Sequence, residues 1–344
     1  MERVIDDGLL AGNGRAADET VYDITIIGGG PTGLFAAYYA GERDASCKVI
    51  DSLDQLGGQL AALYPEKTIY DVGGFPEVLA KELAHRLVQQ ALQRNPTVCL
   101  GEQVLQVDRG SDGVFRLTTT RGTHFSRALV VAAGVGAMTP RRLHVPGAAE
   151  LEGRGLAYHV PSLEPYRGSR VLVVGGGDSA VDWALMLEPV ADGVVLIHRR
   201  PGFRAHETSV RKLKESRVRV LTPYELRALH GVDQVEGATV FQNQTGEEGR
   251  LDVNRVVVSI GFDMDLGPIR DWGLAMDENG IVVDTRMATS VPGIYAAGDL
   301  ASYPGKLKLI ATGFGEAATA VNHAKTFIDP KARLFAGHST SRKH

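Results

Sequence analysis

The alternation of hydrophobic and polar positions predicts two copies of the same supersecondary unit. In residues 22–51 an apolar, strand-like run is followed by a helix of small residues and by a second apolar run. Residues 170–198 repeat this order. Short apolar runs that alternate with helical segments are typical of parallel strands joined by crossover helices. Each copy is therefore predicted to be a βαβ unit, and a glycine-rich turn follows the first strand of both.

The rest of the pattern predicts how these two units are divided between domains. An amphipathic helix is expected over 77–93, and the apolar runs 128–134 and 255–261 each end in a glycine. We interpret these two runs as the edges of an inserted domain, since 344 residues exceed what one hydrophobic core usually serves. The predicted division is 1–138 with 268–344 as one domain and 139–267 as the other, with residues 1–20 loosely held.

Composition excludes several classes of protein. A hydrophobic content of 44% and a charged content of 23% are typical of a globular protein. The polar first twenty residues do not resemble a secretory signal, and the two cysteines, Cys47 and Cys99, form no C-x-x-C pair. We expect a cytoplasmic protein with no membrane insertion and no metal site. A net charge of −4 gives no support to nucleic-acid binding.

The first glycine-rich turn, GGGPTG, has the spacing G-x-G-x-x-G between a strand and a helix. Such a turn lets bare backbone approach a pyrophosphate at the helix N-terminus. Asp51 ends the next strand, where a carboxylate accepts hydrogen bonds from the ribose of an adenine dinucleotide. The alternative is a tight turn followed by a surface aspartate. The predicted binding residues are Gly28, Gly30, Pro31, Thr32, Gly33 and Asp51.

The second turn, GGGDSA, has alanine at the third glycine position, which still allows a helix and a strand to pack closely. The strand that follows ends in HRRPGFR, where the first unit has Asp51. A carboxylate there would repel a 2′-phosphate, whereas guanidinium groups bind it, so this turn is predicted to take NADP(H) in preference to NAD(H). The alternative is a solvated basic turn. The predicted residues are Gly175, Gly177, Asp178, Ser179, Ala180, His198, Arg199, Arg200 and Arg204.

One turn that disfavours a 2′-phosphate and one that favours it predict two different dinucleotides, FAD and NADPH. A third motif, VPGIYAAGDL, supports FAD in the first site, because its strand ends at Asp299, whose carboxylate can bond the flavin ribityl or phosphate groups. The predicted fold class is α/β. It has two Rossmann-like dinucleotide-binding domains, with the NADPH domain inserted into a discontinuous FAD domain.

Over nearly its whole length the chain resembles flavoproteins with two dinucleotide-binding domains, in particular the low-molecular-weight thioredoxin reductases. The motifs GGGPTG, GGQL, GGGDSAVDWAL, HRRPGFRA and GIYAAGD follow one another in the order typical of that group. Thioredoxin reductases carry a C-x-x-C just before the second turn. This chain reads GLAYHVPSLEPYRG at 155–168, without a cysteine. Composition therefore excludes a dithiol relay.

Three segments, GGQLAALYPEKTIYDVGGFP, KLKLIATGFGEAATAVNHAK and the terminal HSTS, resemble ferredoxin/flavodoxin–NADP+ reductases of the thioredoxin reductase type. The resemblance implies that Tyr64 stacks on one flavin face and that His338 reaches the other, often across a homodimer. A disordered tail is the alternative for His338. By the same positional match, four more residues line the FAD site: Gln59, Val104, Met138 and Thr340.

The resemblance implies an enzyme in which NADPH passes a hydride to flavin N5 and the electrons then leave singly to ferredoxin or flavodoxin. The flavin carries this chemistry, so no catalytic acid–base pair is expected. We also expect the inserted domain to rotate about its connections. Two alternatives are an NADPH-dependent flavoprotein that reduces free flavin, ferric chelates or quinones, and a non-catalytic redox sensor.

Two basic clusters are candidates for docking an acidic electron carrier. For each of them a merely solvated charged face is the alternative. The clusters are Arg211, Lys212, Lys214, Arg217 and Arg219, and Lys331, Arg333, Arg342 and Lys343.

Overall fold

A computed structural model describes residues 19–335 and residue 337 of the chain. Its described residues form two compact units, the first within the ranges 1–61, 68–136 and 266–344 and the second within 62–67 and 137–265. The short segment 62–67 therefore belongs to the second unit, whereas the sequence predicted it in the first. Of the N-terminal segment expected to be loosely held, residues 1–18 lie outside the described part.

The first unit is built on a mixed sheet with a parallel half and an antiparallel half. Strands β5, β2, β1 and β8 are parallel neighbours, β21 also pairs with β8 in parallel, and β7 and β6 continue the sheet in antiparallel order. The strands are β1 (Val21–Ile27), β2 (Cys47–Ile50), β5 (Thr97–Cys99), β6 (Val104–Arg109), β7 (Phe115–Thr119), β8 (Thr123–Val131) and β21 (Ile294–Ala296).

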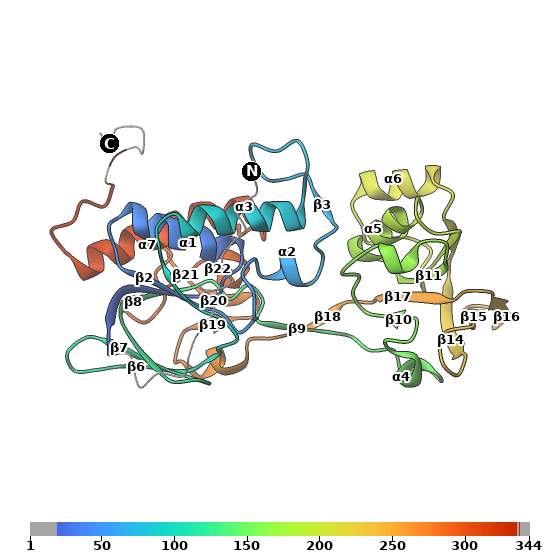
Figure 1. Cartoon of the computed structure of the whole chain (residues 1–344), viewed down its shortest axis with the longest axis horizontal. Coiled ribbons are helices and arrows are strands. Elements are labelled where there is room, and N and C mark those ends of the chain that lie inside the picture. Colours follow the sequence, from blue (N-terminus) through green and yellow to red (C-terminus); the bar gives the residue numbers. More distant parts are fainter. Residues whose placement is uncertain (1–18, 336, 338–344) are drawn as a thin grey trace, which may run out of the picture. The chain divides into compact units, whose positions relative to one another are not determined.

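Three helices cover the first unit's sheet: α1 (Pro31–Glu42), α3 (Ala80–Leu92) and α7 (Ile310–Ile328). Figure 1 shows them side by side along one face of the sheet, with α1 next to both others. The central strands are buried on both faces, as parallel strands usually are, and Ile24, Ile26 and Leu129 are fully buried. The short elements are α2 (Gln59–Ala62), β3 (Thr68–Ile69), β4 (Val78–Leu79), η3 (Gly267–Asp271), β19 (Met276–Asp277), β20 (Gly280–Val282), η4 (Gly298–Leu300) and β22 (Ala301–Ser302).

The second unit has a five-stranded parallel sheet in the order β10-β17-β11-β12-β13. An antiparallel sheet of β14, β15 and β16 accompanies it. The strands are β10 (Leu156–Ala157), β11 (Arg170–Gly175), β12 (Gly193–Ile197), β13 (Arg219–Leu221), β14 (Tyr224–His230), β15 (Gly237–Gln242), β16 (Glu248–Leu251) and β17 (Arg255–Ser259). The helices are α4 (Ala148–Leu151), η2 (Glu164–Tyr166), α5 (Asp178–Leu187) and α6 (Glu207–Glu215).

Strand β11 divides the second unit's apolar residues between two cores. Val171 and Val173 pack with residues of α5 and α6, whereas Leu172 and Val174 pack with residues of α4, β14 and β15. Successive side chains of a strand point to opposite faces, so one uninterrupted apolar run serves both layers. This is why 171–174 has no polar position.

The segments that enter and leave the second unit pair with each other. Strand β9 (Ala137–Pro140) runs antiparallel to β18 (Phe262–Asp265). The prediction of an α/β fold with two Rossmann-like domains, one inserted into the other, is confirmed. Among the described residues, no helix combines the length and the apolar character needed to span a bilayer.

Candidate dinucleotide-binding sites

The first glycine-rich turn lies between β1 and α1, where side chains have no room. Gly28 has a φ of +111°, and a Cβ on it would lie 2.4 Å from the carbonyl oxygen of Ala132. A Cβ on Gly33 would lie 1.8 Å from the carbonyl oxygen of Gly28. Gly30 differs, because the nearest atom beyond its chain neighbours, Gly58 Cα, would be 3.9 Å from such a Cβ. The turn is thus packed from within but open at Gly30, at the N-terminus of α1.

The Asp51 carboxylate closes this turn from the end of β2. Its Oδ2 accepts a hydrogen bond from the Gly29 N–H, and its Oδ1 accepts one from the Leu53 N–H at 2.8 Å. Burial raises the pKa of Asp51 above its usual value, and the two N–H donors partly oppose this shift. The structure therefore holds a carboxylate beside the turn, as a ribose-binding residue requires.

A second pair of glycines supports the first turn from outside. The Gly57 N–H donates to the Gly29 carbonyl at 2.9 Å, and a Cβ on Gly58 would lie 2.8 Å from Gly30 Cα. Both Gly57 and Gly58 have positive φ, a conformation that glycine adopts without strain. The backbone of the GGQL motif consequently packs against this glycine-rich turn.

The turn that carries Asp299, directly after β21, packs on the start of α1 through Gly298. A Cβ on Gly298 would lie 2.8 Å from Thr32 Oγ1, and a Cβ on Gly313 in α7 would lie 2.3 Å from the same oxygen. The start of α1, the turn after β21 and the start of α7 thus meet around Thr32. Burial raises the pKa of Asp299, opposed by the positive charge of Lys306.

The second turn repeats the backbone design of the first. Gly175 has a φ of +151°, and its Cβ would lie 2.2 Å from the Ser259 carbonyl oxygen and 2.9 Å from Ala180 Cβ. Gly177 is the N-cap of α5, and the nearest atom to its Cβ would be the Arg204 carbonyl oxygen, 4.0 Å away. In this turn, too, the first glycine has no room for a side chain, while the glycine at the helix N-terminus is open.

The loop after β12 is tied to the second turn. The Arg204 N–H donates to the Gly176 carbonyl at 2.7 Å, and Asp178 Oδ1 accepts from the His206 N–H at 2.7 Å. The His198 ring fills the space over Gly176, where a Cβ would lie 2.2 Å from His198 Nδ1. This arrangement carries the loop residues to the N-terminus of α5.

His198 contributes a neutral surface to this turn. Its ring stacks on Phe203 with the ring centroids 5.5 Å apart, and its buried Nε2 has no hydrogen-bond partner in the described part of the chain. Burial, assisted by the charge of Arg199, lowers the pKa of His198 below its usual value. The histidine is therefore favoured in its uncharged form, and the loop's positive charge comes from its arginines.

Arg199, Arg200 and Arg204 are all exposed. None of the three forms an ion pair with a carboxylate of the described residues. The backbone beneath them is fixed, because Asn243 Nδ2 donates to the Arg199 carbonyl at 2.8 Å. The structure thus collects three guanidinium groups at the strand end where the first unit has a buried carboxylate, which fits a ligand with an additional phosphate.

The remaining residues predicted to line the FAD site come from several elements. Gln59 begins α2, and a Cβ on Gly134 would lie 3.4 Å from its Nε2. Val104 is buried at the start of β6, and Met138 lies in β9 of the second unit. Two other predicted residues lie outside the described part of the chain: His338 and Thr340.

Tyr64 lies in the short segment that belongs to the second unit. Its side chain packs against the core formed with α5 and α6. In the same segment, Lys67 Nζ lies 3.1 Å from Asp182 Oδ2 and 3.3 Å from Ser179 Oγ. A flavin-stacking role for Tyr64 stays a prediction.

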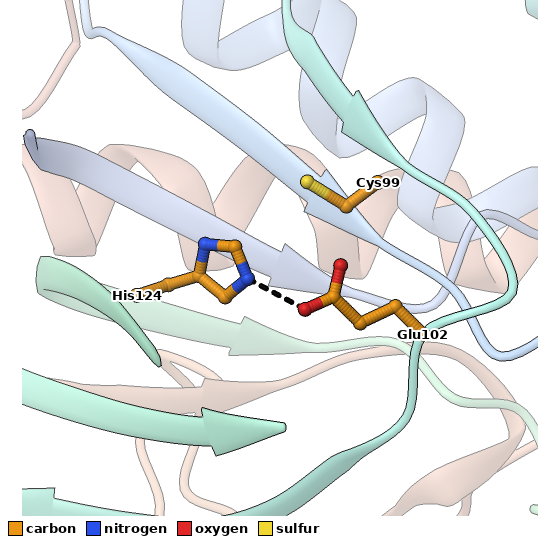
Figure 2. A group of neighbouring side chains, drawn as sticks. All are labelled: Cys99, Glu102 and His124. Atoms are coloured by element: carbon orange, nitrogen blue, oxygen red, sulfur yellow. Dashed lines mark hydrogen bonds and ion pairs between the residues drawn. The ribbon is translucent and has the colours of Figure 1, made fainter. Parts of the chain in front are cut away.

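Figure 2 shows a further cluster of polar side chains, in the first unit. Ligand atoms of Cys99, Glu102 and His124 lie within 4.8 Å of one another. His124 Nε2 is 2.7 Å from Glu102 Oε1, and Lys48 Nζ is 2.8 Å from His124 Nδ1. An ammonium group only donates, so Nδ1 accepts and Nε2–H donates to Glu102. Both imidazole nitrogens have partners and a cation adjoins the ring, which favours a hydrogen-bonded chain over a metal site.

Sequence patterns missed two contributors to the first site. The glycine pair of the GGQL motif was used only as a family marker, although its backbone packs against the turn. Glu316 was not singled out, although it is buried in α7 and its Oε2 accepts from the Gly298 N–H at 2.7 Å. A glutamate on a helix face otherwise made of small residues was the available signal.

Comparisons with known proteins agree with this geometry. Residues 22–324 match the pyridine nucleotide-disulphide oxidoreductase family. The ferredoxin–NADP reductase of Halalkalibacterium halodurans is 57% identical over 324 residues, which are 94% of this chain and 98% of that protein. A protein of the same name from Geobacillus thermodenitrificans is 52% identical over 325 residues, 94% and 98% of the respective chains.

Solved structures show the same fold. Thioredoxin reductase from T. acidophilum is 27% identical with a TM-score of 0.78, covering 91% of this chain and all of that one. Thioredoxin reductase from Lactococcus lactis is 25% identical with a TM-score of 0.76, covering 89% and 99%. Members of this group use FAD and NADPH. A first turn bordered by a carboxylate and a second bordered by arginines fit these two ligands. The chain belongs to the pyridine nucleotide-disulphide oxidoreductase family, in the branch whose curated members are named ferredoxin–NADP reductases.

Proposed function

We propose that this protein is an FAD-dependent enzyme that passes electrons between NADPH and ferredoxin without a redox-active disulfide. The curated relatives carry that name at more than half identity over almost the whole chain. The chain's two cysteines, Cys47 and Cys99, form no disulfide bond with each other. When bound, FAD accepts a hydride from NADPH and releases electrons one at a time.

The first unit is assigned to FAD and the second to NADPH. The observation that supports this most directly is the difference at the two strand ends, a buried Asp51 against the exposed Arg199, Arg200 and Arg204. Asp51 binds a ribose of FAD, Asp299 binds its ribityl or phosphate groups, and the arginines bind the 2′-phosphate of NADPH. Tyr64 and His338 then stack on the two flavin faces.

Two finer statements belong to the same proposal. Flavodoxin, a one-electron carrier like ferredoxin, serves as a second partner. Two chains form a homodimer in which the C-terminal residues of one reach the flavin of the other. The cytoplasm is the proposed location, because cysteines that form no disulfide suit a reducing compartment.

The test is steady-state reduction of a panel of acceptors by the FAD-loaded protein, with NADPH or NADH as donor. Ferredoxins, flavodoxins, free flavin, a ferric chelate and a quinone form the panel. We expect ferredoxin to be reduced at the highest kcat/KM, with NADPH preferred by at least about tenfold because the 2′-phosphate adds charge-assisted hydrogen bonds.

Two results would overturn the proposal. Negligible rates with every ferredoxin and flavodoxin, together with rapid reduction of small acceptors, would make the protein a reductase of small molecules. Slow flavin bleaching by NADPH in a stopped-flow experiment, without turnover on any acceptor, would make it a sensor.

A further inference from the structure

Glu316 is a buried acid on a helix face that otherwise carries small and apolar residues. It lies in α7, and only 4% of its surface is exposed. The other buried positions of this helix are Gly313, Ala317, Ala320, Val321 and Ala324. Burying a carboxylate is costly unless it is paired and hydrogen-bonded, so its partners indicate what it is for.

The Glu316 carboxylate has three partners, all from the segment that follows β21. Oε2 accepts from the Gly298 N–H at 2.7 Å. Oε1 accepts from the Tyr303 hydroxyl at 2.6 Å and from Lys306 Nζ, and the Lys306 side chain is 8% exposed. Burial and the neighbouring carboxylate raise the pKa of Tyr303 to about 12, so its hydroxyl stays a donor at neutral pH.

These contacts fix the turn that carries Asp299. Gly298 has a φ of +79° and packs so tightly on Thr32 that a Cβ would lie 2.8 Å from Thr32 Oγ1. The same glycine is also held through its backbone, because its N–H donates to Glu316. Asp299 is the next residue, so its position depends on where Glu316 holds this turn against Thr32 at the start of α1.

Stability alone gives a weak reason for such a group. A buried ion pair often contributes no more to folding than well-packed apolar residues of similar volume would. A carboxylate that accepts from a backbone N–H next to a binding residue does, however, determine geometry that an apolar side chain could not. The same carboxylate also holds the Lys306 ammonium close to the turn.

We propose that Glu316 is a positioning residue for FAD, holding the Gly298–Asp299 turn in its binding geometry through the Gly298 N–H and through Lys306. Glu316 itself does not contact the cofactor in this proposal. The inference rests on the proposed location of FAD in the first unit.

The experiment measures the FAD dissociation constant of apoprotein by titration, followed by quenching of flavin fluorescence, together with the melting temperature of each apoprotein. Glu316→Leu removes all three hydrogen bonds, and we expect its dissociation constant to rise by about tenfold or more, since one of them is a charge-assisted bond to the turn. Glu316→Gln keeps one carbonyl oxygen for the Gly298 N–H. It is expected to lie between Glu316→Leu and the unaltered protein, and it serves as the test if the leucine variant does not fold.

Glu42→Leu is the matched control. Glu42 is a buried glutamate of the same unit, at the far end of α1 from the turn, and is paired with Arg94. We expect it to lower the melting temperature of the apoprotein and leave the FAD dissociation constant within about twofold of the unaltered protein. Equal effects of Glu316→Leu and Glu42→Leu on both quantities would overturn the proposal.

A double-variant cycle with Asp299→Asn separates this inference from the proposed location of FAD. If Glu316 acts through Asp299, the two substitutions are expected to weaken FAD binding less than additively. If Asp51→Asn and Asp299→Asn both leave FAD affinity unchanged, the proposed location fails. If those two weaken binding but Glu316→Leu does not, or if its effect adds fully to that of Asp299→Asn, only the positioning role fails.

Discussion

The two glycine-rich turns have the same backbone construction but opposite surroundings. In both, the first glycine (Gly28 or Gly175) lies against a carbonyl oxygen at the end of a neighbouring strand. The N-cap glycine (Gly30 or Gly177) leaves the helix N-terminus open. Around the first turn, the protein satisfies its own polar groups, since Asp51 accepts N–H donors from Gly29 and Leu53. Around the second, Arg199 and Arg200 remain exposed.

A glycine-rich turn of this kind depends on one set of residues for its backbone geometry and on another set for the choice of its ligand. The positive-φ glycine is a requirement of the strand–turn–helix geometry, and both turns meet it in the same way. In the function proposed above, selection comes from the end of the next strand, which carries a carboxylate in one unit and a basic loop in the other. A buried carboxylate at the first strand end suits a cofactor that is retained, and exposed arginines at the second suit a ligand that exchanges.

The largest expected effect comes from substituting the positive-φ glycine that both turns share. Gly28→Ala forces a Cβ to 2.4 Å from the Ala132 carbonyl at a φ of +111°, so we expect the apoprotein to lose about 3 kcal/mol or more and to bind no FAD. Gly30→Ala is the matched variant, because its Cβ meets no atom within 3.9 Å.

Gly30→Ala is expected to cost the apoprotein at most about 1 kcal/mol, as a change of N-cap residue does, while weakening FAD. Chemical denaturation of both apoproteins and FAD titration provide the measurements. An apoprotein of ordinary stability carrying Gly28→Ala would contradict the packing argument, and normal FAD affinity with Gly30→Ala would contradict the open approach.

A smaller effect is expected where the two turns differ. The double substitution Arg199→Ala with Arg200→Ala should raise KM for NADPH by about 10- to 100-fold and leave KM for NADH within about twofold, because only NADPH carries the 2′-phosphate. Initial rates with both donors measure this. Arg170→Ala is the control, since Arg170 is an arginine paired with Asp252 at the opposite end of β11. A parallel loss with NADH would mean that the arginines support the fold and do not select the donor.

The smallest expected effect concerns how each unit stabilises a glutamate carboxylate. The first encloses Glu102, which bonds His124 and Thr119, whereas the second pairs Glu188 with an Arg217 whose side chain is 82% exposed. Although burial alone raises the pKa of Glu102, the hydrogen bonds from Thr119 and His124 bring it below its usual value. Glu102→Gln should therefore lower the first unit's free energy of unfolding at neutral pH by about 1 kcal/mol.

The pH dependence gives the sign of this effect. A carboxyl whose pKa is lowered by folding stabilises the protein above its unfolded pKa, and the contribution is lost as the pH falls through the folded pKa. The difference between Glu102→Gln and the unaltered protein should thus disappear in acid, whereas Glu188→Gln should stay within about 0.5 kcal/mol at any pH, as exposed pairs do. A pH-independent effect of Glu102→Gln would show that packing and not charge is lost.

Local pattern was sufficient for the elements that are buried on both sides. The runs 22–27 and 170–174 predicted parallel strands, and glycine spacing predicted both turns, because a strand and a positive-φ turn restrict residue types locally. The expected helix over 77–93 begins only at Ala80, since Val78 pairs with Ile69 in a two-stranded antiparallel sheet. Such a pairing depends on a partner that no local period reveals.

The placement of a site residue was predictable where it follows from the motif. Asp51 and the arginines after β12 lie where the sequence predicted them, because the end of the second strand is fixed relative to the turn, and their binding roles stay predictions. The roles of Glu316 and of the His198 ring were not found, because each depends on which distant backbone group lies opposite. Glu316 meets Gly298, eighteen residues earlier in the chain, and His198 meets Gly176.

The pairing of β9 with β18 has a consequence for how such a chain could arise. Phe262 pairs with Pro140 and Asp265 with Ala137, so the two ends of the inserted unit are hydrogen-bonded neighbours. Because the ends of the second unit lie side by side, the first unit has to close only a short gap in its chain. The loop-closure entropy of the first unit is therefore hardly affected by the length of the insert. In evolutionary terms, a unit with adjoining ends can be inserted at one loop of a host domain without rebuilding the host's sheet.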